Sequence, residues 1–340
     1  ERRPRRRRIV PARDGQVFHA VREDVTMQET PSLDLLAPAE AAQRMRQALG
    51  ELSAPFFAVL DGGMHDDLSG FLNQQGIQAK SLFRQETAAD IIRAGPWLVA
   101  LADVLKQGIV ERLDAEHSCT VYWSCGLPEE DVRRHLRSIN EILIPVEQPD
   151  GTFSQAFERV LFRHWDPNVL GAVLPLLIGE QISRFLGPAD AVIFNAPDYG
   201  GLKRARATVD LPAAPPGPLR FEPDQMVRLK AVMLHSSRLR IARFLKGNVP
   251  AHFSGVDDSF LWGATLASET SADELGIRTE RGRARWAYVM MMSDGKAANA
   301  PEIRSYIRDG GDTPDNRVKS LIQHTADALR SNPSLTGGLA

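Results

Sequence analysis

The sequence contains little cysteine. Cys119 and Cys125 are its only two cysteines in 340 residues, and they lie in one short segment. A secreted protein held together by a disulfide framework, or a zinc ribbon, needs more cysteines at wider spacing. Both classes are therefore excluded, and we expect the chain to reside in a reducing cytoplasm.

The sequence also lacks a long apolar run and a strong charge of either sign. Its longest apolar run, Val169 to Ile178, is interrupted by Pro175 and is far shorter than the roughly 20 residues that span a bilayer. The basic start continues into Pro11 and Arg13 rather than into the apolar core of a secretory signal. The formal net charge of -2 argues against bulk attraction to nucleic acid or to an anionic membrane. We therefore expect neither a membrane nor a specific nucleic acid as a partner.

The remaining composition, 43% hydrophobic and 25% charged, is typical of a soluble globular protein that is long enough for two cores. Changes in composition along the chain indicate four segments. They are a basic, disordered tail (1–36), an α/β domain (37–205), a proline-rich linker (206–220) and a helical domain (221–332). For the arginine-rich stretch Glu1–Arg8, a phosphate-binding arm and with it nucleic-acid binding remain the alternative to a tail.

Strand-like and helix-like patterns alternate through the first half of the chain. Such alternation predicts an α/β fold with a mixed, largely parallel sheet flanked by helices. Two further strand-like runs, Glu141 to Val146 and Phe157 to Arg163, flank the turn Pro149-Asp150-Gly151 and predict a hairpin. Beyond the proline-rich segment only helical patterns occur, so a small all-α C-terminal domain is expected to follow.

The stretch from Val160 to Leu170 combines a strand end, two charges and a helix start. Asp166 suits a helix cap, because its carboxylate can accept the free amides of the first turn, and Pro167 suits the first helical position. Pro175 is expected to kink or end that helix. Arg163 lies three residues before Asp166, and an ion pair between them would set the corner between strand and helix. If Asp166 is buried against the arginine, its removal costs roughly 3 to 5 kcal/mol. An active carboxylate is the alternative, although nothing nearby supplies a base or a metal spacing.

A second candidate site follows the apolar run Phe56 to Leu60. The turn Asp61-Gly62-Gly63 precedes a helix start, where free amides can hold an anion. A plain turn is the competing interpretation, because the stretch lacks the glycine spacing of a dinucleotide site and the lysine of a phosphate loop. The run His65-Asp66-Asp67 suggests a metal, but adjacent helix positions point to different faces. We expect neither a metal nor another cofactor.

A helix predicted to start at Pro128 carries Arg133 and Arg137 away from its apolar face. This pair suits a phosphate or an acidic segment of a partner, whereas a solvated face or an internal pair with Asp166 is the simpler interpretation. No Gly-x-Ser-x-Gly elbow, His-Glu-x-x-His pair or calcium loop occurs, so an enzyme is not expected. The alternative is an enzyme or binding protein for a phosphorylated small molecule, with Asp61, Gly62 and Arg137 around one sheet edge.

Several short segments form an ordered set of motifs: Phe57-Ala58-Val59-Leu60-Asp61-Gly62, Ser81-Leu82-Phe83, Ala94-Gly95-Pro96-Trp97-Leu98-Val99, Arg134-His135-Leu136-Arg137, Leu161-Phe162-Arg163-His164-Trp165-Asp166-Pro167 and Phe185-Leu186-Gly187-Pro188. Their order and spacing resemble the family of type VI secretion effector chaperones, also called adaptor proteins (Tap or TEC) and long catalogued as a domain of unknown function. The resemblance covers about Phe56 to Phe194. From Leu275-Gly276-Ile277 onward, the chain is similar to the helical tail that many members carry.

The resemblance implies a cytoplasmic, non-catalytic protein that binds a cognate toxic effector, usually near the effector's N-terminus, and loads it onto the VgrG spike. Three positions depart from the family, which usually has a second aromatic residue at His164, tyrosine at Trp165 and often arginine at Asn168. The departures bear on local geometry and partner choice. The residues expected to bind a partner or to form the motifs are Asp61, Gly62, Trp97, Arg134, Arg137, Arg163, Trp165 and Asp166.

Overall fold

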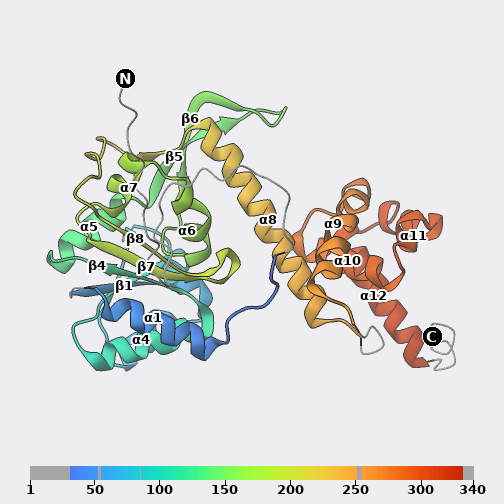
Figure 1. Ribbon diagram of the computed structural model, residues 1–340, viewed down its shortest axis with the longest axis horizontal. Coiled ribbons are helices and arrows are strands. Elements are labelled where there is room, and N and C mark those ends of the chain that lie inside the picture. The colour runs from blue at the N-terminus through green and yellow to red at the C-terminus, as the bar shows by residue number, and fades with distance from the viewer. Residues whose placement is uncertain (1–30, 53–54, 85, 251–254, 332–340) are drawn as a thin grey trace, which may run out of the picture. The chain divides into compact units, whose positions relative to one another are not determined.

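The computed structural model describes residues 31–52, 55–84, 86–250 and 255–331 (Figure 1). These residues form two compact units. The first comprises 36–232, and the second comprises 31–35 together with 233–331. Most of the predicted tail lies outside the described residues, but Leu33, near its end, is buried in the second unit. Within the described ranges, no helix is both long enough and apolar enough to cross a membrane.

The first unit contains most of the strands and helices predicted from the sequence. Short 3-10 helices are labelled η. In chain order, its elements are α1 (Pro38–Gly50), β1 (Phe56–Asp61), η1 (Gly62–Met64), α2 (Leu68–Gln74), β2 (Ala79–Ser81), α3 (Ala89–Arg93), β3 (Pro96–Ala100), α4 (Val104–His117), β4 (Thr120–Ser124), α5 (Glu129–Ser138), β5 (Glu141–Glu147), β6 (Phe153–Leu161), α6 (Pro167–Val173), η2 (Leu174–Leu176), α7 (Gly179–Leu186), β7 (Ala191–Ala196), η3 (Pro197–Tyr199), β8 (Gly201–Arg206) and β9 (Leu219–Arg220).

Six of these strands form one sheet, sheet A, in the order β2-β3-β1-β4-β7-β8. Every neighbouring pair in it is antiparallel. The expected α/β class holds in its mixture of helices and strands, but the prediction of a largely parallel sheet is wrong.

The error has a topological cause. Two pairs of strands joined through a helix do run in the same direction, β1 with β2 and β3 with β4. An oppositely directed strand lies between the members of each pair, β3 in the first case and β1 in the second. The strands β2 and β3, which are joined through α3, are antiparallel neighbours. Alternating strands and helices therefore neither fix the relative direction of successive strands nor show whether those strands are neighbours.

Helices cover both faces of sheet A, because its central strands are apolar on both sides. Successive residues of a strand point to opposite faces, so Val59 belongs to one core and Leu60 to the other. Figure 1 shows α1 and α4 on one side of the sheet and α5, α6 and α7 on the other. The helices fill the first core with Leu136, Leu170 and Phe185, and the second with Leu49, Leu72 and Val110.

A smaller sheet, sheet B, has the order β6-β5-β9. Strands β5 and β6 form the predicted hairpin, which is confirmed, and β9 pairs parallel to β5. The proline-rich segment 206–220 lies within the first unit, where the carbonyl of Pro212 accepts a hydrogen bond from the Ser183 hydroxyl at 2.6 Å. The division between the units falls after Val232, inside the long helix α8 (Pro223–Gly247).

The second unit is helical, and the expected all-α C-terminal region is confirmed. Its two apolar clusters use Met291 as a buried residue and Met290 and Met292 at their margins, so these methionines fill the core. After the second half of α8, its elements are α9 (Asp258–Glu274), α10 (Glu280–Met292), η4 (Lys296–Asn299), α11 (Pro301–Arg308) and α12 (Pro314–Ser331).

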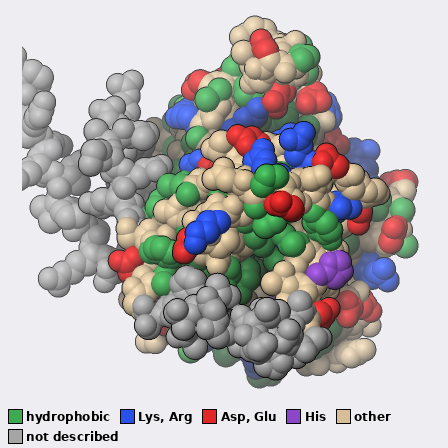
Figure 2. All heavy atoms as spheres, turned by 90° about the vertical axis from the view of Figure 1, so that its right-hand side faces the viewer, with side chains coloured by type: hydrophobic (Ala, Val, Ile, Leu, Met, Phe, Trp, Pro, Cys, Tyr) green, Lys and Arg blue, Asp and Glu red, His purple; other side chains and the backbone are tan. Residues whose placement is uncertain are grey.

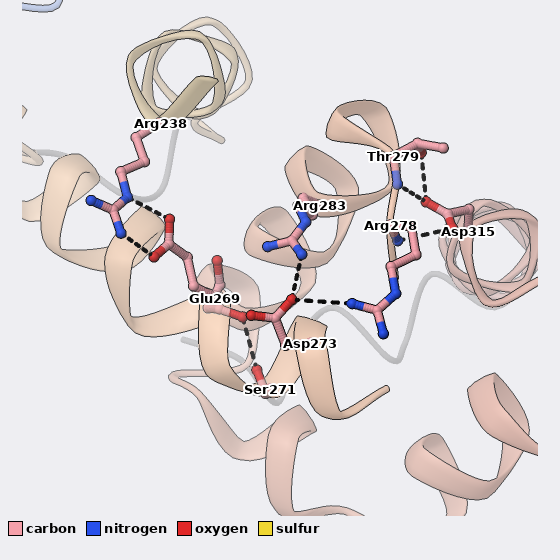
Figure 3. Close-up of polar contacts among 9 residues, drawn as sticks. Arg238, Glu269, Ser271, Asp273, Arg278, Thr279, Arg283 and Asp315 are labelled. Atoms are coloured by element: carbon pink, nitrogen blue, oxygen red, sulfur yellow. Dashed lines mark hydrogen bonds and ion pairs between the residues drawn. The ribbon is translucent and has the colours of Figure 1, made fainter. Parts of the chain in front are cut away.

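Polar contacts fix these helices against one another (Figure 3). Arg238 of α8 forms a bidentate ion pair with Glu269 of α9, with two nitrogen–oxygen distances of 2.6 Å. Asp315, near the start of α12, accepts a hydrogen bond from the backbone nitrogen of Thr279 at 2.9 Å. Thr279 in turn caps α10, so the N-terminal ends of α10 and α12 are held together.

Helix α4 carries a buried carboxyl group, Asp114, whose titration should affect the stability of the first unit. Asp114 accepts a hydrogen bond from the backbone nitrogen of Thr120 at 3.0 Å, and burial raises its pKa from 3.8 to about 7. The unfolded chain loses this proton near pH 4 and the folded chain keeps it until about pH 7, so the free energy of unfolding falls as pH rises through that window.

Asp114→Asn, which keeps the accepting oxygen, should therefore stabilise the protein at pH 8 and change it little at pH 4. The check is the melting temperature of variant and wild type across that range. Glu116→Gln, at an exposed carboxylate of the same helix, is the control and should leave the profile unchanged. A constant difference between Asp114→Asn and wild type at all pH values would contradict the raised pKa.

Candidate functional site

The candidate site begins where the central strand β1 ends, at Asp61. The side chain of Asp61 is 3% exposed. Its Oδ1 atom accepts a hydrogen bond from the backbone nitrogen of Gly63 at 3.0 Å and caps η1. The amide that the sequence offered to an external anion is thus bound by the protein's own carboxylate. The plain turn, rather than an anion site, is the interpretation that this geometry supports.

Arg163 connects two carboxylates that are far apart in sequence. Its Nη2 atom lies 2.6 Å from Oδ2 of Asp61 and 3.4 Å from Oδ2 of Asp166. The predicted pair between Arg163 and Asp166 is therefore present, but the shorter contact is to Asp61, which the sequence analysis did not predict. The buried Asp61 carries the larger desolvation cost of the two carboxylates, so it depends most on the guanidinium.

Asp166 has a second role at the start of α6. Its Oδ1 atom accepts hydrogen bonds from the backbone nitrogens of Asn168 at 2.9 Å and Val169 at 3.3 Å. The predicted cap and the start of the helix at Pro167 are confirmed. As expected from Pro175, α6 ends at Val173 and continues as the 3-10 helix η2.

Gly62 and Trp97 lie beside Asp61 because the chain passes very close there. A Cβ atom on Gly62 would lie 2.3 Å from the carbonyl oxygen of Arg93 and 2.7 Å from that of Gly95. Trp97 donates its indole N–H to the same Arg93 carbonyl at 3.3 Å. Only a residue without a side chain fits at position 62. Close backbone packing therefore explains why a glycine occupies this position, and no bound ligand is needed to explain it.

The aromatic part of the motif is buried under this corner. Trp165 packs edge-on against Phe83, with ring centroids 5.6 Å apart, and against His164 at 5.3 Å. His164 is fully buried, and its Nε2 atom lies 2.9 Å from Oδ1 of Asn140. Burial lowers the pKa of His164 from 6.5 to about 3, so its imidazole is neutral at physiological pH. His164 and Asn140 belong to the site but were not predicted; the departure from an aromatic residue at position 164 was the available signal.

The other two predicted site residues lie elsewhere on the first unit. Arg134 is 73% exposed and pairs with Asp131 on the same helix at 2.7 Å. Arg137 lines a pocket to which neither Asp61 nor Gly62 contributes. The trio required by the phosphorylated-ligand hypothesis is therefore not assembled, and the partner of Asp166 is Arg163 rather than Arg137.

The groups considered for metal binding and nucleophilic chemistry are engaged in packing. His65 lies edge-on to His117, with ring centroids 5.0 Å apart. Among the described residues, no group of three or more histidine, cysteine or acidic side chains could hold a metal ion. Burial raises the pKa of the Cys119 thiol to about 12 and also raises that of Cys125, so both remain protonated thiols.

Because Asp61 is more deeply buried than Asp166, substitutions at this corner should lower the free energy of unfolding by different amounts. Arg163→Ala leaves Asp61 buried without its cation and should lower the free energy of unfolding by about 3 kcal/mol; this is the lower end for such pairs, because water can reach the site where the half-exposed arginine stood. Asp166→Ala removes a helix cap and a longer ion pair and should cost about 1 to 2 kcal/mol. Urea unfolding of both variants at pH 7 measures the difference. An Asp166→Ala variant that is the less stable of the two would contradict the dominance of the Asp61 contact.

The buried imidazole predicts acid sensitivity. As pH falls below 6.5 the unfolded chain takes up a proton on His164, whereas the folded chain does not until about pH 3, so stability is lost over that window. His164→Phe should cost about 1 to 3 kcal/mol at pH 7, because Asn140 loses its partner, but its stability should fall less between pH 6.5 and 4. Urea unfolding at several pH values tests this, with the exposed His324→Gln as control. Parallel pH profiles for His164→Phe and wild type would contradict it.

Comparison with known proteins finds a match to one family over part of the chain. Residues 56–184 match the model of a family described as Domain of unknown function (DUF4123). This family is known for effector chaperones and adaptors of type VI secretion. No curated protein and no solved structure matches the chain. The stretch that runs from the start of β1 into α7, and contains all of the Asp61–Arg163–Asp166 corner, is thus similar to the DUF4123 family.

Proposed function

We propose that the chain is an adaptor of a type VI secretion system that binds a cognate effector and loads it onto the VgrG spike. The observation that carries the proposal is the DUF4123 match over residues 56–184, which falls on the α/β unit. The motif residues of that match are used to hold the fold: Asp61, Arg163 and Asp166 satisfy one another at the end of the central strand. A protein whose distinctive residues build a scaffold is suited to holding other proteins.

The chemistry of the described side chains supports a non-catalytic, cytoplasmic protein. Both cysteines are buried and free, and a reducing compartment keeps such thiols free. His164, the most buried histidine of the site, is neutral and bonded to Asn140. None of these groups combines the exposure and the base that a nucleophile requires.

The face drawn in Figure 2 also suits a protein partner better than a nucleic acid. On the face drawn in Figure 2, lysine and arginine side chains alternate with acidic ones, and hydrophobic side chains lie among them. Recognition of a phosphate backbone favours a continuous basic surface. The arginine-rich segment Glu1–Arg8, on which the nucleic-acid hypothesis rested, lies outside the described residues.

Co-expression tests the proposal directly. The full-length chain, produced with the VgrG protein and an effector encoded beside it, should retain at least one of them through affinity purification and size-exclusion chromatography. Asp166→Ala, which should stay folded, is expected to retain the same proteins as the wild type. Retention of neither protein by the wild type would refute the adaptor role.

The same preparation tests the alternative of a phosphorylated small molecule. If the adaptor proposal is right, nucleotides and sugar phosphates should leave the melting temperature unchanged. A ligand present at 100 times its dissociation constant would instead stabilise the folded chain by about 2.7 kcal/mol.

A further inference from the structure

The first unit contains a polar pocket of about 370 Å³, which we call the arginine pocket. It lies where the loop after β2, helices α5 and α7, and the hairpin β5–β6 approach one another. It adjoins the site described above, since Phe83 lines it and also packs against Trp165. The charged and polar side chains that line it are Arg84, Thr87, Arg137, Ser138, Asn140, Glu141, Arg159 and Arg184.

The lining has a large excess of positive charge. Four arginines line the pocket, but only one acidic residue, Glu141, does so. Glu141 is already paired, because its Oε2 atom lies 3.0 Å from Nη1 of Arg159. The charges of the other three arginines are not cancelled by any carboxylate that lines the pocket, so the pocket attracts anions.

Arg184 is held in place by neutral acceptors. Its Nε atom donates to the carbonyl of Gly217 at 2.8 Å, and its Nη2 atom donates to the carbonyl of Ser138 at 3.1 Å. Carbonyl oxygens orient a guanidinium but leave its charge in place. Burial lowers the pKa of Arg184 below its ordinary value, in keeping with a cation that has lost part of its hydration without gaining a carboxylate.

The guanidinium groups of Arg84 and Arg137 make no hydrogen bond or ion pair with any other residue that the structure describes. Arg137 is partly buried at the pocket wall. Arg134, one helical turn earlier on α5, is exposed and paired with Asp131. Arg134 and Arg137 thus differ in their availability to a ligand, because only Arg137 of the two lines a pocket with an unpaired guanidinium.

The shape and the apolar part of the lining favour a peptide over a small anion. The guanidinium groups come from four separate elements, whereas one phosphate needs convergent donors, as in a glycine-rich loop. Leu161, whose side chain is 56% exposed, Phe83 and Pro218 supply apolar contacts beside the charges. A peptide with several acidic residues can use both kinds of contact, but a phosphate can use only the charges.

We propose that the arginine pocket binds an acidic segment of a polypeptide partner, with Arg84, Arg137 and Arg184 pairing with its carboxylates. The inference rests on the proposed function in so far as the partner is a protein. It adds the chemistry of recognition and the surface that performs it. Carboxylates bound by guanidinium groups in this way form charge-assisted hydrogen bonds, the strongest class available to such a surface.

The test is binding of a fluorescein-labelled hexaglutamate peptide to the full-length chain, measured by fluorescence anisotropy at about 50 mM salt, where surface charges are weakly screened. Saturable binding to the wild type is expected, and Arg84→Ala/Arg137→Ala should weaken it by about tenfold or more. Arg134→Ala removes one arginine from helix α5 outside the pocket and should weaken binding of the peptide less than about twofold. Melting temperatures close to the wild-type value would show that the variants are folded.

Three outcomes would overturn the inference. They are no saturable binding to the wild type, equal losses of affinity in Arg134→Ala and Arg84→Ala/Arg137→Ala, or displacement of the peptide by inorganic phosphate at a stoichiometry of one. The last would assign the pocket to a small phosphorylated ligand. The proposed function is judged separately. If the wild type retains the spike protein or the effector and Arg84→Ala/Arg137→Ala retains as much, the adaptor role stands and the pocket inference fails.

Discussion

The first unit depends on the neutralisation of one buried carboxylate. Asp61 ends the central strand of sheet A, where hydrophobic strands and helices exclude water, and an unpaired carboxylate there would be costly. Arg163 supplies the opposite charge from a position 102 residues later in the chain. That single contact places the end of β6 and the start of α6 against the end of β1, because the guanidinium also reaches Asp166. The most distinctive motif of the sequence is therefore a structural joint.

The same joint explains why so many of the predicted site residues lie together. Gly62 allows the backbone of Arg93 and Gly95 to approach, and the indole of Trp97 donates to the carbonyl of Arg93. The ring of Trp165 packs against that of Phe83. Each contact limits the freedom of its neighbours, so the corner is held in one shape. Under the proposed function, a partner would bind at surfaces beside this joint, and the arginine pocket is the surface for which we propose a chemical preference.

Parts of this architecture could be predicted from the sequence with good physical reason. The Asp166–Pro167 helix start, the end of α6 near Pro175, the β5–β6 hairpin and the helices of the second unit follow from interactions within a few residues. The direction and order of the sheet strands do not, because the pairing of β1 with both β3 and β4 is decided by contacts between distant segments. The resemblance to effector adaptors drew attention to Asp61, Arg163 and Asp166, but it did not reveal which of them touch.

By itself, the sequence determined where α6 begins and ends, that β5 and β6 form a hairpin, and which short segments resemble a family's motifs, because these depend on local hydrogen bonding, side-chain periodicity and order along the chain. Only the tertiary structure decided that Asp61 is the main partner of Arg163, that sheet A is antiparallel, and that Arg84, Arg137, Arg159 and Arg184 line one pocket. Those arrangements arise when segments far apart in the chain pack together to bury apolar surface. Other strand orders and other ion-pair partners are compatible with the same local sequence pattern, and only the packing selects among them.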